Sequence, residues 1–344
     1  MTLPVKKFKN PRARHNFKGQ TCSIVSVGFY VPERILTNAE LEEMVDTSNE
    51  WILTRTGISE RRIAAKHQTT SDLAAEAARA AMRHAKIHPS EIDLIILATI
   101  TPDMPFPSTA CIVQEKIGAY HAAAFDVQAA CSGFIYGLEI GQQFIMTRTY
   151  ETVLVIGAEK LSSIVDWTDR NTCVLFGDGA GAAILRNRAG AHGLLTACMK
   201  ADGRLTGLLC MPGGGSACPP TVESLAAGLH YLRMDGKETF KRAVTAMSAV
   251  ANEALRRCEL DISEIQCVIP HQANRRIIDA VAERLGAKPE QLFVNLEKYG
   301  NTSAGSVAIA LSEAVECGRI KRGDLVLLVV FGAGLTWGAA VIEW

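Results

Sequence analysis

Apolar and polar positions follow the same order twice along the chain. Each copy begins with an alanine-rich amphipathic segment, continues through a polar link that contains Ser-Glu-Ile, and ends in a β-rich apolar run. The first part has the apolar spacing of a helix, and the last has the uniform apolarity of a strand buried on both faces. The two copies occupy residues 72–99 and 243–272.

The agreement continues downstream of both copies. After the first, "AACSGF" opens a helix and "ETVLVIGAEK" forms a strand; after the second, "YGNTSAGS" and "GDLVLLVVFGAG" do the same. This repeated order predicts a duplicated mixed α/β unit, with corresponding loops meeting at the carboxyl ends of strands. We predict a basic tail over residues 1–20 and two halves, 21–190 and 191–344.

Composition and charge exclude several classes of protein. The 344 residues are 48 % hydrophobic and 21 % charged, with zero formal net charge, so charge gives no basis for a nucleic-acid partner. The longest apolar runs are too short to span a membrane. Ten cysteines are scattered without paired spacing, and the basic N-terminal stretch has no apolar segment of a secretory signal. We therefore expect a cytoplasmic protein with reduced thiols.

One cysteine lies where a strand gives way to a helix. Cys131 in "FDVQAACSGF" is surrounded by Ala129, Ala130 and Gly133, which leave room for an acyl group. Free backbone N–H groups and the helix dipole favour an anion at a helix start, and a nearby histidine adds to this. Most cysteines in such a protein are buried structural thiols, but this setting predicts a lowered pKa and a nucleophilic thiolate.

Two polar residues occupy related positions in the second copy. His271 follows the apolar strand "CVIP", and Asn301 opens the helix that corresponds to the one after Cys131. Alone, the first would usually be structural and the second a helix N-cap. Together, on loops related by the duplication, the three predict a Cys-His-Asn site.

Several motifs taken together resemble one known family. "FDVQAACSGF", "PHQANRRII", "YGNTSAGSVAIAL", "VLFGDGAGAAIL" and "FGAGLTWG" are similar to those of β-ketoacyl-acyl-carrier-protein synthase III, in the thiolase superfamily. The resemblance extends from about residue 21 to residue 344. It implies a thiolase-like five-layered αβαβα fold with two pseudo-symmetric halves, a homodimer, and initiation of fatty acid synthesis.

The resemblance also implies a reaction. An acyl-CoA primer, often acetyl-CoA, acylates Cys131; malonyl-acyl carrier protein then loses CO₂, and its carbanion attacks the thioester. His271 and Asn301 would donate hydrogen bonds to the enolate oxygen. The backbone N–H groups of Cys131 and Ala333 would form a second oxyanion hole, although the family usually has glycine at the latter position. CoA thioesters are the substrates, no cofactor is implied, and His271 has no partner at metal-ligand spacing.

Binding residues can be transferred in the same way. Trp51 and Arg170 match residues that sandwich the adenine of CoA, Arg55 matches one near its phosphates, and Asn274 matches one that holds the pantetheine arm. A half-buried packing role is the equally simple interpretation of Trp51.

The remaining matched positions concern the primer and the carrier protein. Phe106 matches a residue that reaches the partner's acyl pocket, where an aromatic ring should favour a short primer. The segment 211–220 departs from the family pattern in a region that often shapes the pocket. A basic patch for the acidic carrier protein matches Lys241, Arg276 and Arg284, while Glu283 stands where some relatives have lysine.

Other interpretations are less consistent with the sequence. "FGDGAGAA" lacks the ending of a phosphate loop and the full dinucleotide motif, so we predict a tight turn between apolar strands. Papain-like proteases would need "CGSCW", chain-extending synthases use Cys-His-His, and thiolases use a second cysteine. Plant-type polyketide synthases and priming synthases of secondary metabolism share Cys-His-Asn, so they stay open. A non-enzymatic acyl-binding subunit would be expected to lack one of the three residues.

Overall fold

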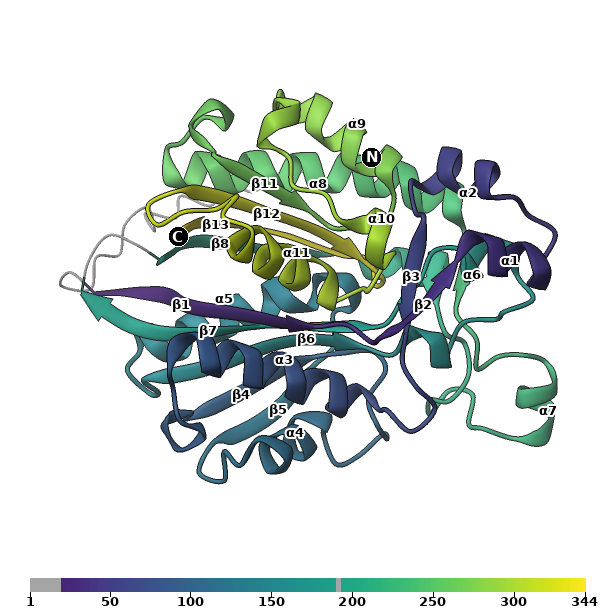
Figure 1. The fold of residues 1–344 in the computed structure, drawn as a ribbon, viewed down its shortest axis with the longest axis horizontal. Helices are drawn as coiled ribbons and strands as arrows, with labels where there is room; N and C mark the ends of the chain where they lie inside the picture. The colour runs from purple at the N-terminus through teal and green to yellow at the C-terminus, as the bar shows by residue number, and fades with distance from the viewer. Residues whose placement is uncertain (1–19, 190–192) are drawn as a thin grey trace.

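Two β-sheets organise the molecule. The computed structural model describes residues 20–189 and 193–344, and Figure 1 shows the two sheets lying one above the other with helices between and outside them. Almost all of the predicted basic tail, residues 1–19, and the predicted division of the halves at residues 190/191 lie outside the described residues. No helix in the described part of the chain is both long and apolar enough to cross a membrane.

The first sheet has the order β1-β7-β6-β4-β5. Strands β4, β5 and β6 run parallel, and β7 is antiparallel to both β6 and β1. The bounds are β1 (Gln20–Tyr30), β4 (Leu94–Ala98), β5 (Ala123–Val127), β6 (Thr152–Glu159) and β7 (Gly179–Ala189).

The second sheet repeats this pairing with the order β11-β12-β13-β8. Strands β11 and β12 are parallel, and β13 is antiparallel to β12 and β8. An isolated parallel bridge from Val268 to Leu292 lies beside β11, where the first sheet has its fifth strand. The bounds are β8 (Gly193–Ala201), β11 (Cys267–Pro270), β12 (Leu325–Gly332) and β13 (Thr336–Glu343).

Six helices complete the layers. Helices α5 (Gly133–Met146) and α11 (Gly305–Glu316) lie between the sheets, as Figure 1 shows. Helices α3 (Thr70–Ala85) and α4 (Thr109–Ile117) cover the outer face of the first sheet, while α8 (Gly236–Cys258) and α9 (Arg275–Leu285) cover the second. This is the predicted αβαβα order of layers.

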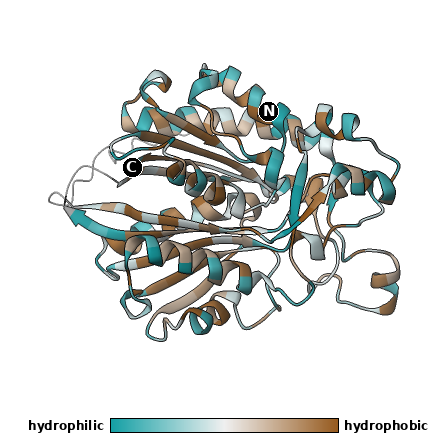
Figure 2. Cartoon of the chain, in the orientation of Figure 1, coloured by the Kyte–Doolittle hydropathy of each residue, from teal (hydrophilic) through white to brown (hydrophobic). Residues whose placement is uncertain are grey.

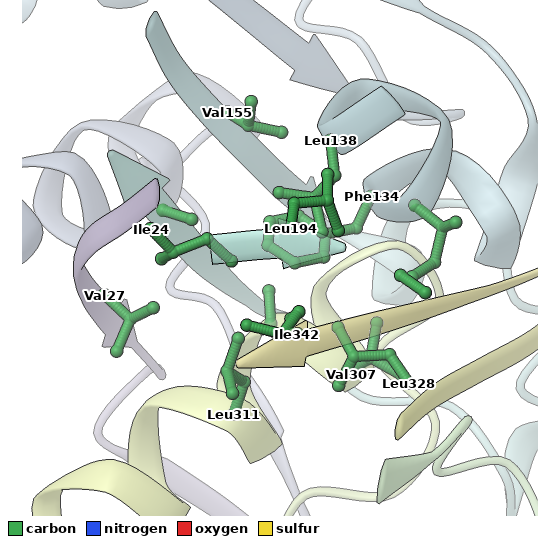
Figure 3. Packing of buried hydrophobic residues seen from close by; sticks show 14 of the residues in the cluster. Ile24, Val27, Phe134, Leu138, Val155, Leu194, Val307, Leu311, Leu328 and Ile342 are labelled. Carbon is green, nitrogen blue, oxygen red and sulfur yellow. The ribbon is translucent and has the colours of Figure 1, made fainter. Parts of the chain in front are cut away.

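Alternation along each buried strand explains why both faces are apolar. In β6, Val155 packs into the core between the sheets, together with Leu138 of α5 and Leu328 of β12 (Figure 3). Its neighbours Leu154 and Ile156 pack on the opposite face, under α3 and α4. Successive side chains of a strand point to opposite faces, so a strand between two helix layers needs apolar residues throughout. Figure 2 shows this apolar interior under a more polar exterior.

The repeated Ser-Glu-Ile tripeptide has a local explanation. It forms the short 3-10 helices η1 (Pro89–Glu91) and η5 (Ile262–Glu264), which link α3 to β4 and α8 to β11. In both, the glutamate accepts a hydrogen bond from the backbone N–H three residues earlier, at 2.8 Å and 2.7 Å. The following isoleucines, Ile92 and Ile265, are buried. The tripeptide therefore caps a turn and anchors it to the core.

A smaller group of elements lies at one end of the layers, at the right in Figure 1. The antiparallel strands β2 and β3 and the helices α1, α2 and α6 belong to it, and α7 projects beyond β9 and β10, just after the segment 211–220. The bounds not yet given are β2 (Arg34–Thr37), β3 (Glu60–Ile63), β9 (Leu209–Cys210), β10 (Arg233–Met234), α1 (Asn38–Met44), α2 (Asn49–Thr56), α6 (Arg170–Cys173), α7 (Val222–Ala226), α10 (Leu296–Tyr299), η2 (Ala130–Ser132), η3 (Leu161–Ser163), η4 (Gly203–Leu208) and η6 (Pro289–Gln291).

The glycine-rich segment 176–183 is not the turn between strands that we predicted. It connects α6 to β7, and its residues from Gly179 onward belong to that strand. A Cβ atom on Gly181 would lie 2.5 Å from the Cβ of Ala308, so glycine is needed for the close approach of α11.

Candidate active site

Cys131 is held at the start of α5, inside the molecule. It lies in η2, after Ala130, whose φ of 45° is unusual for a residue other than glycine, and its side chain is buried. The end of β12 passes directly beside it: a Cβ atom on Gly332 would lie 2.7 Å from the backbone nitrogen of Cys131. Glycine is therefore required for the strand to approach Cys131 so closely.

The expected lowering of the Cys131 pKa is wrong for this structure. Burial raises the pKa of Cys131 to about 12, and the negative charge of Glu159 acts in the same direction. A hydrogen bond from Ser303 opposes the shift but does not reverse it. The position at a helix start is outweighed because an anion loses its hydration in this dry site. Cys131 is therefore a neutral thiol in this structure.

His271 is fixed by both its backbone and its ring. Its backbone N–H donates to the carbonyl of Val329 on β12 at 2.7 Å, and Nδ1 lies 2.6 Å from Oγ of Ser306. Burial lowers the pKa of His271 to about 3, so the ring is neutral at physiological pH. Within the described residues Nδ1 is the one acceptor in contact with the Ser306 hydroxyl, so that hydroxyl donates to Nδ1. The proton of the ring is then on Nε2, which makes it a hydrogen-bond donor.

The side chain of Asn301 is oriented by the chain that follows it. Its Oδ1 accepts a hydrogen bond from the backbone N–H of Ser303 at 2.9 Å, which directs the Nδ2 amide group to donate elsewhere. The backbone of Asn301 is fastened to the first half, because its N–H donates to the carbonyl of Leu175 at 2.8 Å and its carbonyl accepts from Gly177 at 3.0 Å. Asn301 is therefore an uncharged, buried donor.

The loop from Asn301 to Ser306 connects the three predicted residues. Ser306 contacts His271, the backbone N–H of Ser303 holds the Asn301 side chain, and the Ser303 side chain partly offsets the raised pKa of Cys131. Ser303 and Ser306 were not predicted, because neither serine stands out within "YGNTSAGS". Glu159 was not predicted either, because its place at the end of an apolar strand is its only signal in the sequence.

Ala333, the second predicted backbone donor, follows β12 directly. The hydroxyl of Thr336 donates to the carbonyls of both Ala333 and Ala129, at 3.0 Å and 2.9 Å. This bridge ties the turn after β12 to the segment that precedes Cys131. The two backbone N–H groups predicted for the oxyanion hole thus belong to adjoining segments.

The residues predicted to bind CoA form one cluster beside α2. The guanidinium carbons of Arg170 and Arg55 lie 5.1 Å and 5.8 Å from the ring centroid of Trp51. Arg170 also donates to the carbonyl of Asp46 at 2.7 Å. Because Arg170 already lies over the indole, an adenine between them would have to separate the two side chains.

Asn274 is engaged within the protein. It caps the start of α9, where its Oδ1 accepts from the backbone N–H of Arg276 at 2.9 Å, and its Nδ2 donates to the carbonyl of Arg55 at 3.0 Å. The amide thereby joins α9 to α2, next to the Trp51 cluster. A pantetheine group would have to share or replace the contact with Arg55.

The predicted carrier-protein residues lie along α8 and α9. Arg276 lies over the ring of Phe240 at 5.6 Å, Arg284 contacts Thr245, and Lys241 follows Phe240 in α8. The two helices pack against each other, so Arg276 and Arg284 lie at the seam between them, whereas Lys241 pairs with Glu238 within α8. Phe106, by contrast, lies in the loop before α4 and is 83 % exposed.

A metal centre has no candidate in the part of the chain that the structure describes. No group of three or more His, Cys, Asp or Glu side chains there could hold an ion.

Comparisons with known proteins place this site in a family. Family models described as 3-oxoacyl-[acyl-carrier-protein (ACP)] synthase III and its C-terminal part match residues 125–203 and 255–344. The chain is 56 % identical over 321 residues to the β-ketoacyl-[acyl-carrier-protein] synthase III of Caldanaerobacter subterraneus, covering 93 % of this chain and 97 % of that protein. The chain belongs to the β-ketoacyl-acyl-carrier-protein synthase III family.

Solved structures agree with this membership. The synthase III of Aquifex aeolicus superposes with a TM-score of 0.88 at 50 % identity, covering 94 % of this chain and all of that one. The priming β-ketosynthase of the R1128 polyketide pathway also reaches 0.88, at 34 % identity, covering 94 % of this chain and 96 % of that one. The predicted synthase III family, its thiolase-like fold and its acyl-transferring condensing class are confirmed. Cys131 lies in the first matched region, and His271 and Asn301 lie in the second.

Proposed function

We propose that this synthase III condenses a short acyl-CoA primer with malonyl-acyl carrier protein, with Cys131 as the nucleophile and His271 and Asn301 as enolate-stabilising donors. The observation that carries the proposal is the loop from Asn301 to Ser306. In this one loop Ser306 contacts the His271 ring, the Ser303 N–H orients the Asn301 amide, and the Ser303 side chain lowers the pKa of the buried Cys131 thiol against the effect of burial.

The first half-reaction acylates Cys131. The thiol sulfur attacks the primer carbonyl, its proton leaves, and the negative oxygen of the tetrahedral intermediate accepts hydrogen bonds from the backbone N–H groups of Cys131 and Ala333. CoA departs as a thiol. The small residues before Cys131 leave space for the acyl chain, and the Ala333 methyl group must fit beside the thioester.

The second half-reaction needs donors that do not titrate. Loss of CO₂ from the malonyl group places negative charge on its thioester oxygen, where Nε2–H of His271 and the amide of Asn301 donate. A neutral histidine with a pKa of about 3 keeps the same protonation state across the physiological range. The resulting carbanion attacks the acyl group on Cys131 and yields a 3-oxoacyl carrier protein.

Substrate binding rests on the clusters described above. Trp51, Arg55, Arg170 and Asn274 would hold CoA, and the α8–α9 seam would meet the acidic carrier protein. Phe106 would reach the partner's acyl pocket in a cytoplasmic homodimer; its exposed ring supports a covered role in an assembly. An aromatic ring there favours acetyl or propionyl primers, and no cofactor is required.

A priming synthase of secondary metabolism is the second candidate. The structural match to the R1128 enzyme supports it, but at 34 % identity. Relatives named simply as β-ketoacyl-[acyl-carrier-protein] synthase III reach 51 to 56 % identity over similar coverage. This difference favours initiation of fatty acid synthesis.

Intact-mass measurement after incubation with a panel of acyl-CoAs tests the proposal. We expect one acetyl adduct on the wild type and on Cys173→Ala, which loses another buried thiol, and none on Cys131→Ala. Adducts formed only with long or branched primers would favour secondary metabolism. Absence of any adduct that depends on Cys131 would contradict the proposed function.

A further inference from the structure

Thr336 is the first residue of β13 and follows the turn that carries Ala333. Its side chain is partly buried, and its hydroxyl oxygen lies 2.9 Å from the carbonyl oxygen of Ala129 and 3.0 Å from that of Ala333. A threonine hydroxyl has one proton, so the two carbonyl groups share a single donor. Neither half-reaction of the proposed function assigns a role to this residue.

The two carbonyl groups come from segments that are far apart in the chain. Ala129 lies just before η2, and Ala333 follows β12. Carbonyl oxygens carry partial negative charge, so two of them that face the same point repel each other unless a donor lies between them. The Thr336 proton is that donor, and it therefore holds the two segments together.

The Ala129 end of this bridge controls the turn around Cys131. The backbone N–H of Ser132 donates to the same Ala129 oxygen at 3.0 Å, which closes a turn with Cys131 inside it. The direction of the Cys131 N–H is set by this turn. A hydrogen bond from Thr336 to the Ala129 oxygen thus fixes one of the two predicted oxyanion donors relative to β13.

The Ala333 end is part of a turn with few other attachments. Leu335 and Asp202 exchange backbone hydrogen bonds at 3.0 Å and 2.8 Å, which tie the end of the turn to the segment after β8. At the start of the turn, Gly332 packs against the Cys131 nitrogen and pairs with Thr336 across the β12–β13 ladder. Ala333 therefore lies between a packing contact and a hydrogen bond that both reach the Cys131 turn.

Both branches of the Thr336 side chain contact the Ala333 turn. The hydroxyl bonds to Ala333, and a Cβ atom on Gly334 would lie 2.9 Å from the methyl carbon Cγ2 of Thr336. The methyl group thus packs beside Gly334, whereas the hydroxyl alone reaches across to Ala129. Substitutions that remove one branch at a time can separate the two contacts.

We propose that Thr336 is a positioning residue for the first half-reaction, in which its hydroxyl sets the distance and relative direction of the N–H groups of Cys131 and Ala333. Among the described hydrogen bonds of turns, loops and helix caps, neither N–H donates to another backbone group. Two donors stabilise one oxyanion only when both lie at hydrogen-bond distance from the place it will occupy. Thr336 acts through these two residues, and the inference rests on the proposed function.

Thr336→Val and Thr336→Ser test this proposal. The first keeps the branched shape and loses the hydroxyl, and the second keeps the hydroxyl and loses Cγ2. The measurement is the single-turnover rate of Cys131 acetylation by acetyl-CoA, followed by mass. Thr336→Val should lower the limiting rate about tenfold, less than the 10² to 10³-fold cost of deleting a donor, because the donor is displaced rather than lost. The acetyl-CoA concentration at half-saturation should not change, and Thr336→Ser should acylate close to the wild-type rate.

Two further measurements on Thr336→Val show whether the loss concerns the oxyanion. Release of CO₂ from malonyl-acyl carrier protein uses the His271 and Asn301 donors, so its rate should be unchanged. Alkylation of Cys131 by iodoacetamide displaces iodide at a saturated carbon and forms no oxyanion, so its rate should also be unchanged. If either rate fell as much as acylation, the substitution would disturb the thiol or the whole site, and the proposal would be overturned.

Thr196→Val is the matched control. It makes the same change on β8, the strand beside β13, where Thr196 pairs with Val341, and it should acylate at the wild-type rate. Wild-type acylation by Thr336→Val, or equal losses in Thr336→Val and Thr336→Ser, would overturn the proposal. If Thr336→Val failed to fold, Thr336→Ala would be compared with Thr336→Ser in the same assays, because these two differ only in the hydroxyl.

Failure of this inference and failure of the proposed function give different results. An acetyl adduct that forms equally fast on the wild type and on Thr336→Val would remove the role of Thr336 and leave Cys131 as the nucleophile. If the wild type formed no adduct that depends on Cys131, both the proposed function and the role of Thr336 would be overturned.

Discussion

The two halves of the molecule share a framework but carry different chemistry on it. In the first half, β6 ends at a buried carboxylate, Glu159, and α5 is preceded by the thiol of Cys131. In the second half, β11 ends next to neutral His271, and α11 is preceded by the amide of Asn301. The first half supplies a thiol and a buried carboxylate, and the second supplies two uncharged side chains that can donate hydrogen bonds.

This difference shows what a duplicated fold makes possible. Both central helices are entered through a residue with positive φ, Ala130 at 45° and Ser303 at 47°. The same backbone geometry therefore presents the proposed nucleophile in one half and a hydrogen-bonding loop in the other. Each half is incomplete alone, because the thiol and the two proposed hydrogen-bond donors belong to different copies.

The largest effect should come from the nucleophile of the first half. Cys131→Ser should lower condensation at least about 10³-fold, because a hydroxyl does not supply a comparable anion. It should keep malonyl decarboxylation, which depends on the second half. Product formation and CO₂ release, measured separately and beside Cys173→Ser, check this. If a folded Cys131→Ser variant lost both condensation and decarboxylation, decarboxylation would not depend on the second half alone.

His271→Ala should have the reverse and somewhat smaller effect. Decarboxylation should fall about 10² to 10³-fold with the loss of one donor, while acylation of Cys131 continues. Ser306→Ala, which frees the ring from its 2.6 Å contact, should give a decrease of about tenfold in decarboxylation. Equal losses of acylation and decarboxylation in both variants would contradict a donor role.

Stability should depend on pH in opposite ways through the two halves. Glu159 has a pKa of about 7 in the fold against an ordinary 4.5, so between these values the native state binds the extra proton. The free energy of unfolding should therefore fall with rising pH, by up to about 1.4 kcal/mol per unit, relative to Glu159→Gln. His271 has a pKa of about 3 in the fold against an ordinary 6.5, so between these values the unfolded state binds the extra proton. The free energy of unfolding should therefore rise with pH, relative to His271→Asn.

Denaturant unfolding at a series of pH values measures both slopes. The window for Glu159 is pH 4.5 to 7, and that for His271 is pH 3 to 6.5. If the free energy of unfolding of the wild type, relative to each variant, changed with pH in the same direction for Glu159 and His271, the charge states assigned to these two residues would be wrong.

The smallest effect should come from the seam of α8 and α9. Reversing charge at Lys241, Arg276 or Arg284 should raise KM for malonyl-carrier protein a few-fold each, with kcat unchanged and the effect reduced by salt. The control is Lys321→Glu, which reverses a charge just before the first residue of β12. If the three charge reversals changed KM for malonyl-carrier protein no more than the control does, the seam would not be the binding surface for the carrier protein.

Much of the fold could be predicted because periodicity and repetition are local properties of the sequence. The repeated helix, tripeptide and strand correctly indicated two similar units, while the roles of the three polar residues stay a prediction. The burial of Glu159 could not be predicted, because the groups that enclose it come from Thr101 and from Ser303, far away in the chain. The pKa of Cys131 was misjudged for the same reason: hydration depends on the assembled molecule rather than on a helix start.

The close contact of α11 with the first sheet limits how such a protein can be recombined. A Cβ atom on Gly157 of β6 would lie 2.2 Å from the carbonyl oxygen of Ala304, and Phe176 pairs with Asn301 through a parallel bridge. The loop of the second half is thus shaped by the surface of the first. A chimera that joins halves from two relatives would assemble a working centre only if this junction were inherited from one parent.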